Sequence, residues 1–111
     1  MSSLEESDRE AAAHAVAPRV TFADIENAIA HRYDVLARDL ISPNMQECPP
    51  LNTLSLCIVV MTNGFTVVGK SAPASPANFN AEFGKKLAYE DCIRQLWPLM
   101  GFSLRDRLAA L

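Results

Sequence analysis

Three arginines in the C-terminal half of the chain could bind an anionic ligand: Arg94, Arg105 and Arg107. Arginine suits phosphate because its planar guanidinium offers two directed donors and keeps its charge at physiological pH. The charge distribution favours this half, since residues 1–50 hold nine acids and four arginines (net −5) and residues 51–111 hold six bases and four acids (net +2). The alternative is that Arg105 and Arg107 are ordinary solubilising charges on a terminal helix.

Two phenylalanines near these arginines could stack on a nucleobase, because an aromatic ring offers a face to any base. They are Phe79 and Phe102, and either could instead belong to the core, an alternative we favour for Phe102. Arg94 also follows Glu90 by four residues, and Glu90 follows Lys86 by four, which is the spacing of an ion-pair ladder on a helix. The other interpretation is a polar pocket beside a subunit seam, where Arg94 or Lys86 meets a ligand phosphate.

The remaining reactive residues do not form a recognisable catalytic or metal-binding pattern. Cys48, Cys57 and Cys92 are too few and too scattered for a disulfide framework or a zinc site, so we expect a reducing compartment and packing roles for Cys57 and Cys92. His14 and His31 have no nucleophile or acid at a familiar spacing, which favours surface positions. We therefore expect no enzymatic activity, no metal and no cofactor.

Length and composition indicate one small domain that assembles with itself. A chain of 111 residues, half of them apolar and with a net charge of −3, leaves much surface uncovered unless it forms a homo-oligomer. Its longest apolar run, Leu56 to Met61, is about a third of a membrane span, and its acidic N-terminus lacks a signal sequence, so we expect a cytoplasmic protein. The acidic N-terminal half argues against nucleic-acid binding, which needs a basic stripe.

The N-terminal half should hold a tail and one helix. Residues 1–18, rich in Ser, Glu and Ala, are interpreted as a flexible acidic tail, either a frayed helix or disordered, before a single domain at 19–111. Thr21 and Asp24 form a capping signal that opens a helix. The sequence does not fix the C-terminal end of this helix, because apolar residues at 33, 35, 36 and 40 continue a helical spacing up to a proline-rich loop at 42–52.

A β-hairpin is expected at residues 54–61 and 65–70, joined by the turn Thr62-Asn63-Gly64. Alternation places residues 54, 56, 58 and 60 on one face and 55, 57, 59 and 61 on the other, and both faces are largely apolar. We expect helices over one face and a subunit contact over the other, for example a pairing of hairpins. The alternative is that the N-terminal helix covers one face and the long helix covers the other.

A long helix is expected from about Asn78 to Trp97, after the start signal Ser75-Pro76, with Asn78 and Asn80 as rival caps. Pro98 should end or kink it, Gly101 should form a left-handed cap, and a short terminal helix should span 104–111. The fold class is therefore α+β, with an N-terminal helix, an antiparallel hairpin, a long C-terminal helix and a short terminal helix.

Four motifs in the C-terminal half resemble a family of small accessory proteins of tailed bacteriophages and prophages, the N4/Sf6-type phage protein family. They are NGFTVVG at 63–69, SPANFN at 75–80, GKKLAYED at 84–91 and LWPLMGF at 96–102. The resemblance covers residues 20 to 108, and it departs at Asp91, where we expect Asn. An acidic side chain there keeps an acceptor and loses a donor.

The same pattern is similar to phage anti-defence proteins that act as sponges for cyclic nucleotide signals of bacterial immunity, such as those of CBASS and the cyclic ADP-ribose isomers of Thoeris. This resemblance implies an oligomer that encloses the signal between subunits without chemistry. It assigns base stacking to Phe79, a polar edge contact to Asp91, and phosphate contacts to Arg94, Arg105 and Arg107. The alternative is a phage accessory protein that inhibits a host protein through an exposed hairpin edge or apolar surface.

Overall fold

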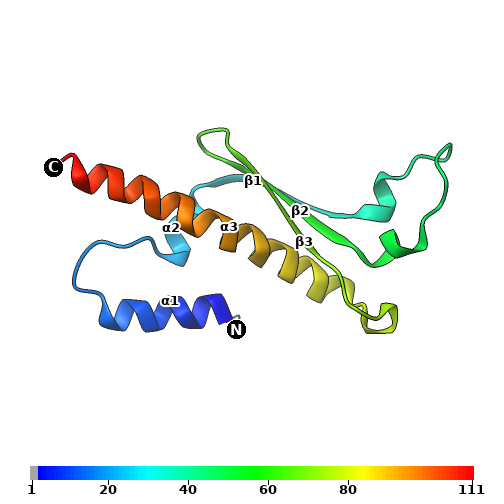
Figure 1. The fold of residues 1–111 in the computed structure, drawn as a ribbon, viewed down its shortest axis with the longest axis horizontal. Helices are drawn as coiled ribbons and strands as arrows, with labels where there is room; N and C mark the ends of the chain where they lie inside the picture. The colour runs from blue at the N-terminus through cyan, green and yellow to red at the C-terminus, as the bar shows by residue number, and fades with distance from the viewer. Residues whose placement is uncertain (1–2) are drawn as a thin grey trace.

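The computed structural model describes residues 3–111 and has the expected α+β class. Its helices are α1 (Ser3–His14), α2 (Phe22–Asn27) and α3 (Ala81–Ala109), its strands are β1 (Ile29–Leu36), β2 (Ser55–Met61) and β3 (Thr66–Ser71), and short 3-10 turns lie at Ala37–Leu40, Pro49–Thr53 and Pro76–Asn78. The strands form one antiparallel sheet in the order β1-β2-β3. The long helix α3 lies across one face of this sheet (Figure 1).

The alternation in the hairpin sets the inner and outer faces of the sheet, as predicted. Ser55, Cys57, Val59 and Met61 are buried, whereas the three residues between them are only partly buried. Cys57, Val59 and Met61 join Val67 of β3 and Ala88, Cys92, Ile93 and Leu96 of α3 in one hydrophobic core. Asn63 and Gly64 form the turn, and Gly64 has a φ of +88°, which glycine adopts without strain.

Helix α3 approaches the sheet closely because small residues line the contact. A Cβ added to Gly69 of β3 would overlap the carbonyl oxygen of Ala88, and one added to Gly84 would lie 2.5 Å from Oγ of Ser55. Both glycines are buried. The distance between helix and sheet is therefore set by the absence of side chains at these two positions.

The segment that continues the helical spacing after Asn27 is a strand, so the expectation of a two-stranded hairpin was incomplete. Helix α2 ends at Asn27, and Ile29–Leu36 pairs antiparallel with β2, with a bulge between Ile29 and His31. The register with β2 places His31, Tyr33 and Val35 on the outer face of the sheet and Arg32, Asp34 and Leu36 on the face toward α3. Apolar residues at 33, 35, 36 and 40 fit both periods over so short a run, and pairing with β2 decides between them.

The predicted break near Pro98 is wrong, because α3 is continuous from Ala81 to Ala109 and there is no separate terminal helix. Pro98 is exposed, so water can reach the Arg94 carbonyl that proline leaves without an amide donor. Gly101 is not a left-handed cap, since Gly64 is the glycine with positive φ among the described residues. At the other end, Asn80 is the cap and accepts a 3.0 Å hydrogen bond from the Phe83 amide.

Both N-terminal helices lie on the same side of the sheet as α3 (Figure 1). Ile25 of α2 is fully buried in the main core, and the predicted Thr21–Asp24 capping box is present. The first eighteen residues include the helix α1, which is held by a 2.8 Å ion pair between Asp8 and Arg19. The alternative in which an N-terminal helix covers the second sheet face is therefore wrong: no element in residues 3–111 covers that face.

Candidate functional site

The predicted ligand-binding residues are spread along α3 and do not meet in one chain. Phe79 precedes the helix, Asp91 and Arg94 lie near its middle, and Arg105 and Arg107 lie in its last turns. At a rise of 1.5 Å per residue, roughly 36 Å separates the start of the helix from Arg105. Any single site built from Phe79 and Arg105 must therefore draw them from different chains.

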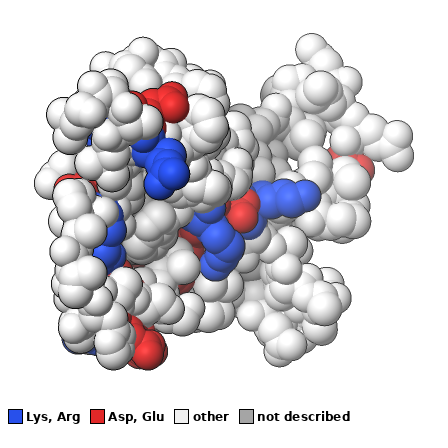
Figure 2. Space-filling model, turned by 60° about the vertical axis from the view of Figure 1, so that its left-hand side comes forward, with Lys and Arg blue, Asp and Glu red and all other residues white. Residues whose placement is uncertain are grey.

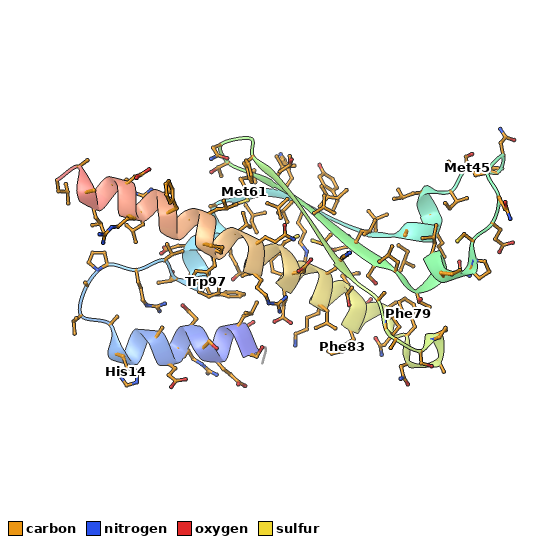
Figure 3. The ribbon with its side chains drawn as sticks, in the orientation of Figure 1. His14, Met45, Met61, Phe79, Phe83 and Trp97 are labelled. Carbon is orange, nitrogen blue, oxygen red and sulfur yellow. The ribbon has the colours of Figure 1, made fainter. Side chains whose placement is uncertain are left out.

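Phe79 lines a pocket of about 210 Å³ at the N-terminal entrance of α3. Phe83 also lines it, and Figure 3 shows the two rings near each other at this end of the helix. The other lining residues are uncharged: Thr53, Ser71, Ala72, Pro73, Asn78, Asn80, Gly84 and Leu87. The pocket combines aromatic and apolar walls with asparagine amides, which are the groups that hold a planar heterocycle.

Asp91 has a structural partner in the edge strand β3. Its Oδ2 accepts a 3.0 Å hydrogen bond from the backbone amide of Lys70, and the side-chain amide of Gln95 donates to the same oxygen at 3.4 Å. Gln95 also donates to the carbonyl of Val68 at 2.9 Å. These two helical side chains satisfy main-chain groups that an edge strand otherwise presents to solvent or to another chain.

The three arginines are exposed, and their contacts within the chain are weak. Arg94 Nη1 lies 3.7 Å from Oδ1 of Asp91, and Arg107 donates to the hydroxyl of Ser103 at 2.9 Å. Arg105 forms no ion pair or hydrogen bond with the described part of the chain. Figure 2 shows Lys and Arg side chains in separate places on the displayed face, interleaved with acids, so this face has no continuous basic stripe.

The ion-pair ladder through Glu90, one of the two alternatives for this stretch of helix, is not observed. Arg94 pairs with Asp91 instead, and Glu90 is only 7% exposed with no ion-pair partner within residues 3–111. Lys86 is exposed. The side chain of Arg94 therefore remains available on the surface of α3, whereas Glu90 points into the packed side of the helix.

Phe102 is not a core residue, contrary to the favoured expectation, because it is 71% exposed. Nearby lies a pocket of about 280 Å³ between the hairpin tip and α3, lined by Met61, Phe65, Leu96, Leu99 and Met100 among others. Phe65 and Leu99 are themselves half exposed. The sequence did not reveal this surface, because Leu99 and Phe65 come together only when the hairpin packs on the helix.

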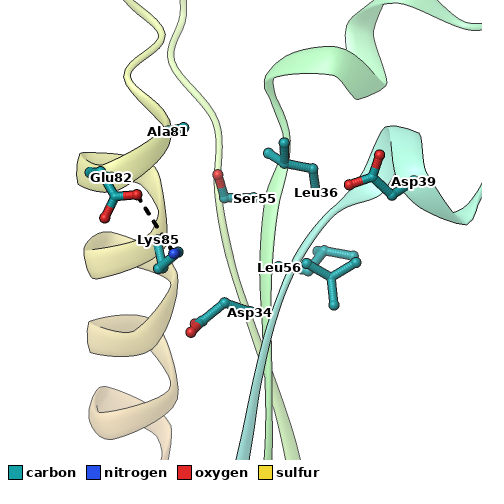
Figure 4. A pocket seen from close by; sticks show the side chains of 9 residues that line it. Asp34, Leu36, Asp39, Ser55, Leu56, Ala81, Glu82 and Lys85 are labelled. Atoms are coloured by element: carbon teal, nitrogen blue, oxygen red, sulfur yellow. Dashed lines mark ion pairs between the residues drawn. The ribbon is translucent and has the colours of Figure 1, made fainter.

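A further hollow of about 240 Å³ lies between the sheet and the first turns of α3 (Figure 4). It is lined by three acids, Asp34, Asp39 and Glu82, and by Lys85, which pairs with Glu82 at 3.6 Å. Ser55 also lines it, and its buried hydroxyl has no hydrogen-bond partner in the described structure. This negative lining opposes a phosphate ligand, so the hollow is not the predicted site.

The cysteines are packing residues or exposed thiols with no disulfide between them in the described chain. Cys57 and Cys92 are fully buried, and burial raises the pKa of the Cys57 thiol to about 12 and also raises that of Cys92. Both thiols are therefore protonated at neutral pH and are poor nucleophiles. Residues 3–111 contain no cluster of three or more His, Cys, Asp or Glu side chains that could hold a metal ion.

The model of the phage protein (N4 Gp49/phage Sf6 gene 66) family matches residues 20–108. The chain belongs to this family. No curated protein and no solved structure matches it. Within the described part of this phage protein, none of the helices has the length and apolar character needed to cross a membrane.

The family region of this phage protein begins after α1 and ends inside α3. Its NGFTVVG motif forms the hairpin turn and most of β3, and its GKKLAYED motif supplies Gly84 and Ala88, the first buried residues of α3. The Asn expected at position 91 could also accept from the Lys70 amide, so Asp91 keeps the contact to β3 and loses only a donor.

Proposed function

We propose that this phage protein is an anti-defence sponge, which binds a cyclic nucleotide immune signal in the cytoplasm of the bacterial host and lowers its free concentration without chemistry. The observation that carries the proposal is the uncharged pocket of Phe79 and Phe83 at the start of α3. Family membership supports the phage context. The signal itself, whether of the Thoeris or the CBASS type, is left to experiment.

The size of the Phe79 pocket suits one base of such a ligand. At about 210 Å³ it is smaller than the roughly 300–1,000 Å³ of pockets that enclose a whole drug-sized molecule. A cyclic dinucleotide would therefore place one base here and its phosphates elsewhere. Stacking of a base on an aromatic side chain is worth about 1–3 kcal/mol.

The phosphates would be bound by arginines of a second copy, because Phe79 and Arg105 lie at opposite ends of α3 in one chain. Arg94, Arg105 and Arg107 are exposed and only weakly engaged, so their donors are available. A homo-oligomer is thus part of the proposal. A sponge must bind tightly, and a nanomolar dissociation constant corresponds to roughly 12 kcal/mol, which several charge-assisted contacts and a stacked base together could supply.

Calorimetric titration of the purified protein tests this proposal directly. The panel should contain cyclic di- and trinucleotides, cyclic ADP-ribose isomers and short single-stranded DNA. We expect submicromolar binding to one cyclic nucleotide at a constant ratio per subunit. If a folded, oligomeric protein bound no member of the panel, the proposal would be contradicted.

Two pairs of variants locate the site once a ligand is found. Phe79→Ala should weaken binding at least tenfold, whereas Phe102→Ala, at an exposed ring in the C-terminal part of α3, should have no effect. Arg105→Ala should likewise weaken binding, whereas Arg38→Ala, an exposed arginine near β1, should not. Equal affinity of Arg94→Ala and Arg105→Ala variants with the parent would remove the phosphate assignment.

The second candidate function is inhibition of a host protein. The half-exposed Phe65 and Leu99 around the 280 Å³ pocket favour it, because an apolar surface rimmed by polar residues is typical of a protein contact. The β3 edge suits this role less well, since Asp91 and Gln95 already bond the Lys70 amide and the Val68 carbonyl there. Pull-down from bacterial lysate with the parent and with a Phe65→Ser variant distinguishes this candidate. A host protein that is recovered with the parent and not with Phe65→Ser supports it.

A further inference from the structure

The two edges of the sheet differ in a way that points to a specific contact. On β3, the Lys70 amide and the Val68 carbonyl are bonded to Asp91 and Gln95 of α3. This arrangement blocks the addition of another strand at that edge. The chain thus closes one edge of its sheet with its own side chains.

The other edge, on β1, is open. The Ala37 amide donates to the Leu54 carbonyl at 3.0 Å, so residues 31, 33 and 35 also direct their main-chain groups toward β2. Arg32 and Asp34, which lie between the bulge at 29–31 and the 3-10 turn capped by Leu36, must then direct theirs outward, and no backbone hydrogen bond outside the regular elements joins them to the rest of residues 3–111. Residues 30–34 are all exposed, as expected for an uncovered edge strand.

The side chains of β1 are complementary to those of a second β1 that runs antiparallel to it. Arg32 and Asp34 lie two residues apart on the same face, and Arg32 Nε is 3.1 Å from Oδ1 of Asp34. Rotation about an axis through Tyr33 sets Arg32 of each copy opposite Asp34 of the other. Opposite charges at directly facing positions stabilise a pair of strands, and like charges destabilise it.

We propose that β1 pairs with β1 of a second copy of this chain about a two-fold axis at Tyr33, joining two three-stranded sheets into one six-stranded sheet. Such an isologous contact is the commonest form of homo-dimer. The two Tyr33 rings then meet on the outer face, beside the apolar residues Val35 and Ile58. This pairing does not require a ligand. Its test is therefore independent of the test of the sponge function.

A single strand seam is smaller than the roughly 800 Å² per partner of most stable complexes, so we expect a dissociation constant in the micromolar range. Sedimentation equilibrium of the wild-type chain should therefore show a monomer–dimer equilibrium without ligand. A chain that stays monomeric at millimolar concentration overturns the proposal.

Charge variants test which residues face each other. Arg32→Asp alone sets two carboxylates opposite each other at both positions, and Asp34→Arg alone sets two guanidiniums opposite each other. Each variant should raise the dissociation constant at least about tenfold. A mixture of the two variants should form a heterodimer with an affinity close to that of the wild type, because each Asp then faces an Arg of the other chain.

The mixture separates the contact between chains from the pair within one chain, since neither variant retains an Arg32–Asp34 pair of its own. Circular dichroism of each variant checks that it is folded. Unchanged dimerisation of the single variants, or folded variants that fail to recover in the mixture, contradicts the proposed register.

A cysteine pair tests the same geometry and does not depend on the charge variants. In a Cys48→Ser background, which removes the exposed native thiol, Tyr33→Cys should form an intermolecular disulfide under mild oxidation. Because Tyr33 directs its main-chain groups toward β2, the two copies of residue 33 would face each other as a non-hydrogen-bonded pair. Such pairs have Cα atoms about 4.5 Å apart, which a disulfide can bridge. Val68→Cys is the matched control, because Val68 lies on the same face of the sheet and both residues are 54% exposed. Equal crosslinking of the two variants would indicate face-to-face or random contact and would overturn the strand pairing.

Discussion

Asp91 of α3 accepts a 3.0 Å hydrogen bond at Oδ2 from the backbone amide of Lys70 in β3. The residue that the resemblance assigns to a ligand edge is thus also the residue that closes an edge of the sheet. Both roles are compatible, because Oδ1 of Asp91 lies 3.7 Å from Arg94 and takes no part in the bond to Lys70, and the Asp91 side chain is 31% exposed.

Replacement of Asp91 should therefore affect stability and association together. Asp91→Ala should lower the free energy of unfolding by about 1 kcal/mol, since the Lys70 amide loses its partner. It should also promote self-association through the released β3 edge. Urea denaturation and light scattering measure the two effects. Asp91→Asn is the control, because it retains an acceptor, and a loss equal to that of Asp91→Ala would argue against the edge contact.

Gly69 is expected to tolerate no side chain. The added Cβ of Gly69→Ala would overlap the Ala88 carbonyl and lie 2.8 Å from Sγ of Cys92, so α3 must move away from the sheet. The expected loss is about 1–3 kcal/mol in the free energy of unfolding, which urea denaturation measures. A variant as stable as the parent would show that the helix does not lie this close to β3.

Gly101 should respond in the opposite direction. It lies inside α3, its φ is not positive, and a Cβ there meets nothing within 4 Å. Gly101→Ala should therefore raise the free energy of unfolding by about 0.5–1 kcal/mol, because alanine loses less backbone entropy in a helix. Thermal denaturation against the parent measures the gain. Destabilisation would instead indicate the left-handed cap and the broken helix expected from the sequence.

The capping box of α2 should make part of the stability depend on acidic pH. The backbone amide of Thr21 donates a 2.9 Å hydrogen bond to the Asp24 carboxylate, and the Thr21 hydroxyl accepts one from the Asp24 amide. The Thr21 amide first, and its hydroxyl second, hold the pKa of the Asp24 carboxyl below its usual value of 3.8. The stabilisation is therefore complete above pH 3.8 and is lost as pH falls through the lowered pKa. The parent should exceed Asp24→Ala in stability at neutral pH by at most about 1 kcal/mol, and this difference should shrink as the pH falls below 3.8 through the lowered pKa. A difference that is constant across this range would exclude the charged cap.

The three thiols should differ sharply in reactivity. Cys48 is exposed, whereas Cys57 and Cys92 are buried and the pKa of Cys57 is raised to about 12. A colorimetric thiol reagent at about pH 8 should therefore modify one thiol per native chain and all three after denaturation. A Cys48→Ser variant that still reacts rapidly when native would show that the core opens more readily than its packing indicates.

The sequence by itself determined the class of the fold and its central elements. The Asn63-Gly64 turn, the alternation from Ser55 to Met61 and the Thr21–Asp24 capping box are local signals, and each is present in the structure as predicted. Such signals can be read from sequence because neighbouring residues alone satisfy them. The motifs at 63–102 also identified the phage family correctly.

Tertiary contacts decided the rest. The residues of β1 fit a helix or a strand until β2 offers them main-chain partners, and α3 continues through Pro98 because the freed carbonyl lies on an exposed side. The separation of Phe79 from Arg105 follows from that continuous helix. The closed edge of the sheet depends on residues 21 positions apart, Lys70 and Asp91, whose contact exists only once α3 packs on β3. Long-range pairing of this kind leaves no periodic trace along the chain, so only the folded structure reveals it.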